Sequence, residues 1–158
     1  MAARPEDWTI VRDDLRGDRV VSLLDRHFRG MLENSPEGGT HFLDLDGLRR
    51  PDVTFWTVWE GAALLGCGAL RELDPDHGEV KSMRTDDEHL GRGVGRRLLG
   101  HILTEARSRG YVRVSLETGS SEAFDAALRL YITSGFEPCG PFGDYTENPF
   151  SRFFTLEL

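Results

Sequence analysis

Three glycines, at positions 91, 93 and 95, form the part of the sequence that is best suited to bind a ligand. Glycine reaches backbone conformations that are closed to other residues, so such a loop can turn consecutive N–H groups toward one anion. The apolar residues that follow have helical spacing, and the N-terminus of a helix favours negative charge. Taken alone, the pattern fits a phosphate-binding loop or a tight turn that packs a helix against a sheet.

The neighbouring residues exclude two common phosphate-binding motifs. A P-loop has Lys and then Ser or Thr after its glycines, whereas Arg96 and Arg97 stand here. A dinucleotide-binding fold places its glycines in an opening strand–helix–strand unit, whereas this loop follows an antiparallel meander. The predicted strands of that meander are Val53–Trp59, Leu64–Leu73 and Gly78–Arg84.

Hydrophobic spacing and turn residues predict the other elements of the fold. Helices are expected at Val20–Leu32, Leu43–Leu48, from Val94 until Gly110, and at Glu122–Ser134. Further strands are expected at Trp8–Val11, Val112–Leu116, Phe136–Cys139 and Arg152–Leu156. Antiparallel strands followed by alternating strands and helices predict an α/β fold, a mixed and largely antiparallel sheet with helices on both faces. We expect one domain over residues 1–158.

Composition limits the classes of function. The net charge of −8 argues against a nucleic-acid-binding protein, which needs a basic surface. No apolar run approaches the roughly 20 residues that cross a bilayer, and the first residues lack a secretion signal, so we expect a cytoplasmic protein with no membrane partner. Cys67 and Cys139 lack paired spacing, and the histidines lack the spacing of a helical metal site, so no metal is expected.

Two segments resemble signatures of the GNAT superfamily of N-acetyltransferases. Leu90-Gly-Arg-Gly93-Val-Gly95 is similar to the central motif, Arg/Gln-x-x-Gly-x-Gly/Ala, between a strand and a helix. Leu130-Tyr-Ile-Thr-Ser-Gly-Phe136 is similar to the second, a helix that ends in Leu-Tyr-x-x-x-Gly-Phe. Leu90 departs from the usual Arg or Gln, which removes one polar contact near a pyrophosphate and leaves the backbone contacts. The likeness runs from about Phe55 to Phe154 and is closest to a bacterial branch of poorly defined substrate.

The resemblance implies direct transfer of an acetyl group from acetyl-CoA to the primary amine of a small molecule or amino-acid-like acceptor. The strands at Gly78–Arg84 and Val112–Leu116 would run parallel and splay apart, leaving a cleft for the pantetheine arm. The expected cofactor-binding residues are Met83, Arg84, Leu90, Gly91, Arg92, Gly93, Val94, Gly95 and Arg96. Two alternatives stay open: a protein or peptide amine acetyltransferase, and a CoA-binding module without turnover.

The same resemblance suggests residues for the chemistry. Tyr131 matches the tyrosine that faces the CoA sulfur as general acid, and its alternative role is packing on the sheet. Glu79 is the candidate base, acting directly or through water, and its alternative is a salt bridge to Lys81 or plain solvation. Candidate acceptor-binding residues lie in polar loops and are Ser35, His41, Asp144 and Tyr145. The identity of the acceptor and the oligomeric state, a homodimer included, stay open.

Overall fold

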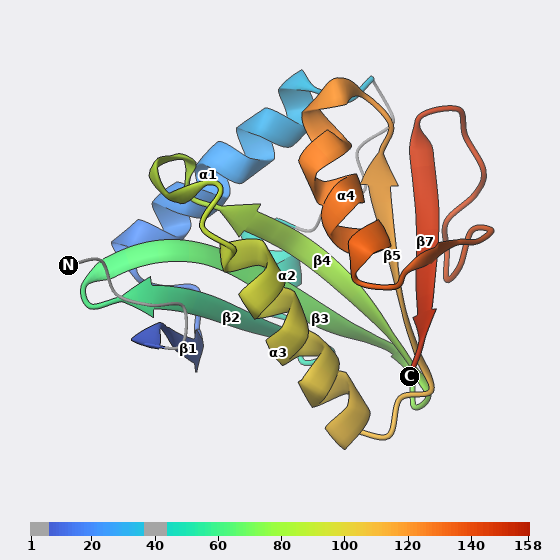
Figure 1. Ribbon diagram of the computed structural model, residues 1–158, viewed down its shortest axis with the longest axis horizontal. Coiled ribbons are helices and arrows are strands. Elements are labelled where there is room, and N and C mark those ends of the chain that lie inside the picture. Colours follow the sequence, from blue (N-terminus) through green and yellow to red (C-terminus); the bar gives the residue numbers. More distant parts are fainter. Residues whose placement is uncertain (1–6, 37–43) are drawn as a thin grey trace.

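The computed structural model describes residues 7–36 and 44–158 as a twisted sheet with helices on its two faces (Figure 1). The strands are β1 Thr9–Arg12, β2 Val53–Glu60, β3 Ala63–Asp74, β4 His77–Thr85, β5 Arg113–Gly119, β6 Glu137–Pro138 and β7 Ser151–Glu157. The helices are α1 Asp18–Glu33, α2 Leu45–Leu48, α3 Val94–Ser108 and α4 Asp125–Thr133, with short 3₁₀ turns η2 Asp87–His89 and η3 Glu122–Phe124. None of these helices is long and apolar enough to cross a membrane.

The strand order is β1-β2-β3-β4-β5-β7-β6. Strands β4 and β5 pair in parallel, and the other neighbouring strands pair antiparallel. The predicted meander is therefore confirmed as β2, β3 and β4. The prediction of a mixed, largely antiparallel sheet with helices on both faces is confirmed as well.

Each face of the sheet buries its own apolar cluster, because alternate side chains of a strand point to opposite faces. On one face, Leu98 and Ile102 of α3 pack with Leu70 and Val80 of the sheet, and Tyr131 of α4 belongs to the same cluster. On the other face, α1 and α2 pack against alternate residues of β2 and β3, namely Phe55, Cys67 and Ala69. Figure 1 shows α3 and α4 on the near side of the sheet and α1 beyond it.

Some boundaries differ from the expected ones. The helix expected at Glu122–Ser134 starts as a 3₁₀ turn and becomes α-helical only at Asp125. The strand expected at Phe136–Cys139 is shortened to two residues, and its Pro138 has no N–H to donate to a ladder. The helix expected from Leu43 starts at Leu45, because Asp44 has an extended backbone and caps it by accepting a hydrogen bond from the Gly47 N–H; Leu43 lies outside the described residues.

A β-bulge interrupts β4 at its middle. Cys67 of β3 faces Arg84, yet Ala69, two residues further along β3, faces Lys81, three residues back along β4. The extra residue of β4 lies at Ser82, which takes a left-handed φ of 56° although it has a side chain. A bulge bends its strand and leaves a residue outside the ladder, so β4 is re-aimed at this point.

Candidate active site

A cleft opens where β4 and β5 separate. The two strands pair only from His77 to Glu79 on β4, opposite Arg113 to Ser115 on β5. Beyond Glu79 the strands diverge, and a pocket lies between them. It is lined by residues of α1, β4, β5 and α4, among them His27, Glu79, Lys81, Met83, Glu117 and Tyr131. The expected pair of parallel, splayed strands with a cleft between them is confirmed.

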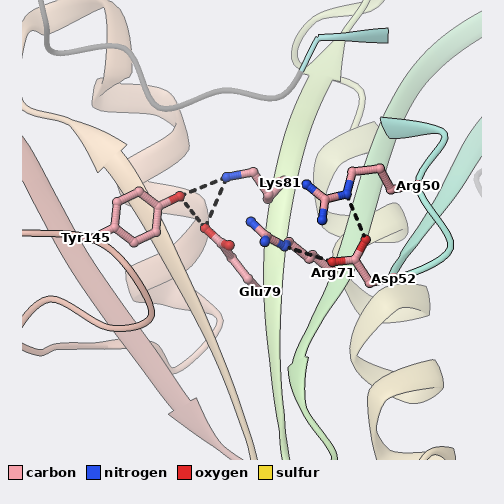
Figure 2. A network of polar contacts seen from close by, with 6 residues as sticks. All are labelled: Arg50, Asp52, Arg71, Glu79, Lys81 and Tyr145. Carbon is pink, nitrogen blue, oxygen red and sulfur yellow. Dashed lines mark hydrogen bonds and ion pairs between the residues drawn. The ribbon is translucent and has the colours of Figure 1, made fainter. Parts of the chain in front are cut away.

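Glu79 lies in the cleft at the last paired position of β4, and it belongs to a triangle of polar groups (Figure 2). Its Oε2 accepts a hydrogen bond from the Tyr145 hydroxyl at 2.5 Å and from Lys81 Nζ at 3.2 Å. Lys81 Nζ also donates to the Tyr145 hydroxyl at 2.8 Å. Only 1% of Glu79 and 8% of Lys81 is exposed, so this ion pair is withdrawn from water.

A second ion-pair group lies beside the triangle and joins Arg71 of β3 to Asp52 and Arg50, which precede β2 (Figure 2). Arg71 is the residue directly opposite Glu79 across the β3–β4 pair. Its Nε lies 3.2 Å from Asp52 Oδ2, and the same carboxylate lies 3.6 Å from Arg50 Nε. The negative charge of Asp52 therefore offsets part of the positive charge that Arg71 presents to Glu79.

Tyr131 approaches the cleft from the opposite face of the sheet. Its ring packs against Phe136 with centroids 5.8 Å apart and edge-to-face geometry, and 6% of the residue is exposed. Burial raises the pKa of the Tyr131 hydroxyl above its usual value near 10. At neutral pH the Tyr131 side chain is thus a protonated phenol, and it lines the cleft.

The cleft therefore has a carboxylate on one face of the sheet and a phenol on the other. Glu79 lies on the same face of the sheet as Arg71, Lys81 and helix α1. Tyr131 of α4 lies on the other face, in the apolar cluster that includes α3. A carboxylate can take a proton from an amine, and a phenol can give one to a departing thiolate. Their positions let two reactants meet in the cleft from opposite sides.

The glycine loop lies at the start of α3, after β4 and the η2 turn. Gly91 and Gly93 have φ angles of 75° and 86°, and Gly93 is the N-cap residue of α3. A Cβ added at either glycine would meet no heavy atom within 4 Å, so space lies beside this backbone. The first N–H groups of a helix lack partners within the helix, so they can bind an anion there.

Comparison with known proteins agrees with this geometry. The model of the acetyltransferase (GNAT) family matches residues 16–136. The chain belongs to the GNAT family. A Bacillus subtilis (strain 168) protein named uncharacterized N-acetyltransferase YsnE is 53% identical over 146 residues, which cover 92% of this chain and 97% of that protein. The expected acetyl-CoA-dependent N-acetyltransferase is confirmed as family and enzyme class.

Two further similarities concern substrates. A protein of Azospirillum brasilense named IAA acetyltransferase is 37% identical over 151 residues, covering 95% of this chain and 97% of that protein. A GNAT family acetyltransferase from Elizabethkingia anophelis, solved with acetyl-CoA bound, has the same fold, with a TM-score of 0.61. It is 18% identical, and the match covers 97% of this chain and 99% of that one.

In this GNAT chain, the side chains of the glycine loop have structural partners. The Arg92 guanidinium lies 2.7 Å from Glu60 Oε2, 2.9 Å from His89 Nδ1 and over the ring of Trp8. The Val94 side chain is buried in the α3 cluster, and Leu90 is 64% exposed. The side chains of Arg92 and Val94 thus have partners within the protein, and the part of the prediction that concerns their backbone groups is unaffected.

Arg96, also expected to bind the cofactor, lies in the first turn of α3, and its Nη2 donates to Thr133 Oγ1 at 2.8 Å. Met83 lines the cleft, and its sulfur packs where a Cβ on Gly68 would lie. Arg84 points to the other face, where its Nη1 lies near Gly30 of α1. Its Nη2 donates to Asp87 at 3.1 Å, and its Nε is buried without a partner among the described residues.

We expect Gly93→Val to weaken CoA binding about 10- to 100-fold, the effect of losing one charge-assisted hydrogen bond. The added side chain would fill the space beside the loop and would be strained at a φ of 86°. Isothermal calorimetry with CoA measures the effect.

Gly110→Val is the matched control for Gly93→Val. Gly110 has a φ of 83° and open space around its Cβ position, but it lies beyond the C-terminal end of α3. Both variants carry the same backbone strain, so only Gly93→Val should lose affinity. Unchanged CoA affinity in a folded Gly93→Val protein contradicts a phosphate site on this loop.

His27 of α1 is a cleft residue that sequence reasoning missed. Its side chain is buried and lines the same pocket as Glu79. Burial, and next the charge of Arg84, lower the pKa of His27 to about 4. The histidine is therefore neutral at pH 7. Nothing in its sequence neighbourhood separates it from the other residues of an amphipathic helix.

The low pKa of His27 predicts a loss of stability in mild acid. The unfolded chain takes up the proton near pH 6.5 and the folded protein only near pH 4, so stability falls as pH decreases through this window. His27 should make the protein about 2 kcal/mol less stable at pH 5 than at pH 8. Urea unfolding at both pH values measures this difference, and His27→Leu should remove it. An equal acid loss in His27→Leu would show that other groups cause it.

The four candidate acceptor-binding residues have different positions. Tyr145 contacts Glu79 directly, as described above. Ser35 follows α1, and its Oγ is buried without a partner among the described residues. Asp144 is exposed, and His41 lies outside the described residues. Only Tyr145 of these is placed at the polar triangle.

Within the described residues, Asp86, Glu88 and His89 could offer ligand atoms to one metal ion. These atoms lie within 4.8 Å of one another. Two of the three groups have partners already, since Asp86 pairs with Arg26 at 3.1 Å and His89 Nδ1 contacts Arg92. The group lies outside the residues that line the cleft.

Proposed function

We propose that this protein transfers the acetyl group of acetyl-CoA directly to the primary amine of a small acceptor within the β4–β5 cleft. One observation carries the proposal: Glu79 and Tyr131 line the same cleft from opposite faces of the sheet. Direct transfer needs a base for the amine and an acid for the thiolate, and each must lie on its own side of the thioester. The arrangement meets both needs.

The residues around the cleft fit CoA. The open space beside Gly91 and Gly93, at the N-terminus of α3, suits the pyrophosphate. The bulge of β4 at Ser82 and Met83 leaves backbone groups outside the ladder at the divergence of the strands, where they can bind the pantetheine arm and polarise a carbonyl. The acetyl-CoA found in the structurally similar acetyltransferase supports this donor.

Acetyl-CoA supplies an activated acyl group, and the protein supplies position and proton transfer. Glu79 takes a proton from the acceptor ammonium, so that the neutral amine can form the new C–N bond. As the C–S bond breaks, Tyr131 would give its hydroxyl proton to the leaving sulfur, and the nitrogen would give up its second proton to the Tyr131 phenolate as it becomes an amide. Backbone N–H groups at the bulge stabilise the carbonyl oxygen while it is negative.

A small acceptor fits the surroundings of Glu79 better than a protein does. Tyr145 and Lys81 contact Glu79, and the carboxylate is almost fully buried. An extended peptide would have to displace Tyr145 and the segment that carries it, whereas a small amine need only enter the pocket. The relative named IAA acetyltransferase is consistent with a small acceptor.

A thiol-release assay with acetyl-CoA tests the function against a broad panel of small amines, amino acids and peptides. Release of CoA thiol that depends on a small amine supports the proposal. Release with peptides alone would assign the protein to the peptide-acetylating alternative. If calorimetry shows that CoA binds but no acceptor causes release of the CoA thiol, the result would support the alternative of a CoA-binding module without turnover.

A further inference from the structure

The two carboxylate oxygens of Glu79 have unequal surroundings (Figure 2). Oε2 accepts two hydrogen bonds, from Tyr145 and from Lys81. Oε1 is buried, and no described residue donates a hydrogen bond to it. A buried carboxylate oxygen without a donor is costly, so this atom is suited to a donor that arrives with a ligand.

The direction of each bond in the triangle is fixed by chemistry. A lysine ammonium has only donors, and a tyrosine hydroxyl has one proton. The Tyr145 proton goes to Glu79 Oε2, at 2.5 Å, so the phenol oxygen accepts the bond from Lys81. Burial, and next the charge of Glu79, raise the pKa of Tyr145, which keeps the hydroxyl protonated as a donor.

We propose that Lys81 and Tyr145 are positioning residues that together hold Glu79 by its Oε2, so that Oε1 is the atom that receives the proton of the acceptor amine. The inference rests on the proposed function and adds two residues to it. Neither Lys81 nor Tyr145 needs to touch the acceptor for this role. Lys81 supplies a positive charge in direct contact with the Glu79 carboxylate, and Tyr145 fixes the orientation of that carboxylate.

Lys81 is the charged partner of the buried Glu79 carboxylate. A carboxylate removed from water takes up a proton unless a nearby cation stabilises its charge. Lys81 Nζ is the cation in direct contact with Glu79, at 3.2 Å. Without it, the buried carboxylate would lack a cationic partner, so Lys81→Met should favour the protonated form of the carboxyl group.

Other charged and titratable groups face Glu79 from the elements around it. Arg71 of β3 is directly opposite and is paired with Asp52. His77 lies two residues earlier on β4 and contacts Ser115 Oγ at 2.7 Å. Glu117 of β5 also lines the cleft and accepts a hydrogen bond from Ser151 at 2.6 Å. Substitution of Lys81 or Tyr145 leaves these other groups unchanged in sequence. A shift of the acid limb of the pH profile in those variants would therefore reflect the loss of the contacts that Lys81 and Tyr145 make with Glu79.

The first measurement is the pH profile of kcat/KM for the wild type, Lys81→Met and Tyr145→Phe. Loss of a contacting cation raises a carboxylate pKa by about 1–3 units, so Lys81→Met should move the acid limb upward by that amount. Tyr145→Phe keeps the ring packed against Phe142 and Phe153 and should move the limb by about one unit. KM for acetyl-CoA should change little in both variants.

The chain offers a matched control for the Tyr145–Glu79 bond. The Tyr111 hydroxyl donates to Glu72 Oε1 at 3.0 Å, away from the cleft. Tyr111→Phe also removes a Tyr–Glu hydrogen bond, one in which the tyrosine is buried and the glutamate is exposed, so it should leave the acid limb where the wild type has it. A limb that moves equally in Tyr111→Phe would show a general effect of lost stability and would overturn the positioning role.

The second measurement does not depend on turnover. Carbon-13 NMR of glutamate-labelled protein follows the side-chain carboxyl of Glu79, assigned by its absence in Glu79→Gln. The titration midpoint should rise in Lys81→Met and Tyr145→Phe in the absence of any acceptor. A midpoint that stays at the wild-type value in both variants overturns the proposal.

The two measurements separate the proposal from the function on which it rests. A raised midpoint together with a raised acid limb supports both. A raised midpoint with an unmoved limb would show that Glu79 is not the base, which overturns the assignment of Oε1 and leaves acetyl transfer standing. A protein that releases no thiol with any acceptor contradicts the proposed function, while the NMR titration still decides whether the triangle controls Glu79.

Discussion

Tyr131→Phe should lower kcat about 10²- to 10⁴-fold, the contribution of one general acid, and should leave CoA affinity almost unchanged. The substitution removes the hydroxyl that lines the cleft and keeps the ring that packs edge-to-face on Phe136. A loss of chemistry without a loss of binding therefore identifies proton donation. Steady-state kinetics with the acceptor found in the panel gives kcat, and calorimetry gives the CoA affinity.

The control for this variant is Phe136→Leu, which disturbs the packing of the Tyr131 ring without removing its hydroxyl. It should lower the free energy of unfolding, and it should lower kcat far less than Tyr131→Phe does. If Tyr131→Phe turns over at a near-normal rate, Tyr131 is a packing residue, and water must protonate the leaving thiolate.

Burial changes how Tyr131 and the thiolate are matched. The pKa of an unperturbed phenol, near 10, lies close to the pKa of a thiol, near 8.5, so the phenol can donate a proton to the thiolate at little cost. The buried position raises the pKa of Tyr131 above that value. The pKa of the Tyr131 hydroxyl is therefore less closely matched to that of a thiol in the free protein than it would be in water. The same low-dielectric cleft destabilises a thiolate, which raises its own pKa and restores part of the match.

Glu79→Gln should lower kcat/KM about 10²- to 10⁴-fold at neutral pH. The amide has the size of the carboxylate, but it cannot take a proton from the acceptor. Because the amide cannot act as a base, the acid limb of the wild-type pH profile should be replaced by a rise of the rate at higher pH, where the acceptor amine loses its proton to water. The rates of the wild type and the variant should converge at high pH, where the acceptor amine is neutral without help. Kinetics from pH 6 to pH 10 measures both effects.

Glu72→Gln is the matched control, since Glu72 also accepts a tyrosine hydroxyl but lies outside the cleft. Its kcat/KM should equal that of the wild type. Glu79→Gln also leaves Lys81 as a buried cation without its carboxylate, so its stability must be compared by urea unfolding. A folded Glu79→Gln protein with a wild-type rate and an unchanged acid limb would exclude Glu79 as the base.

The strand meander and the glycine loop could be predicted because each depends on local sequence, whereas the position of Tyr131 was implied by the resemblance of its segment to a family signature. Strand periodicity, consecutive glycines and a helix that ends in Gly135 are short-range signals. The link from Glu79 to Tyr145 has no such signal, since it joins residues 66 positions apart. Sequence reasoning had both residues as candidates, one catalytic and one in an acceptor pocket, but had no basis for placing them in contact.

The bulge of β4 could not be predicted for a related reason. A bulge that uses a left-handed residue usually shows a glycine, yet Ser82 occupies this position. The consequence is large, because the extra residue lets Arg84 share a face with Lys81 despite their odd spacing. His27 and Arg84 line the same cleft, and after burial the charge of Arg84 is the second cause that lowers the pKa of His27.

The contacts of Arg92 imply that the cofactor loop is assembled when the protein folds. Glu60 of β2, the ring of Trp8 and His89 hold the Arg92 guanidinium, so the segment between Gly91 and Gly93 is anchored to the far edge of the sheet. A loop that is already ordered loses little conformational freedom when an anion binds. CoA should thus meet a preorganised receptor, and the entropy of ordering its phosphate site is part of the folding free energy instead of the binding free energy.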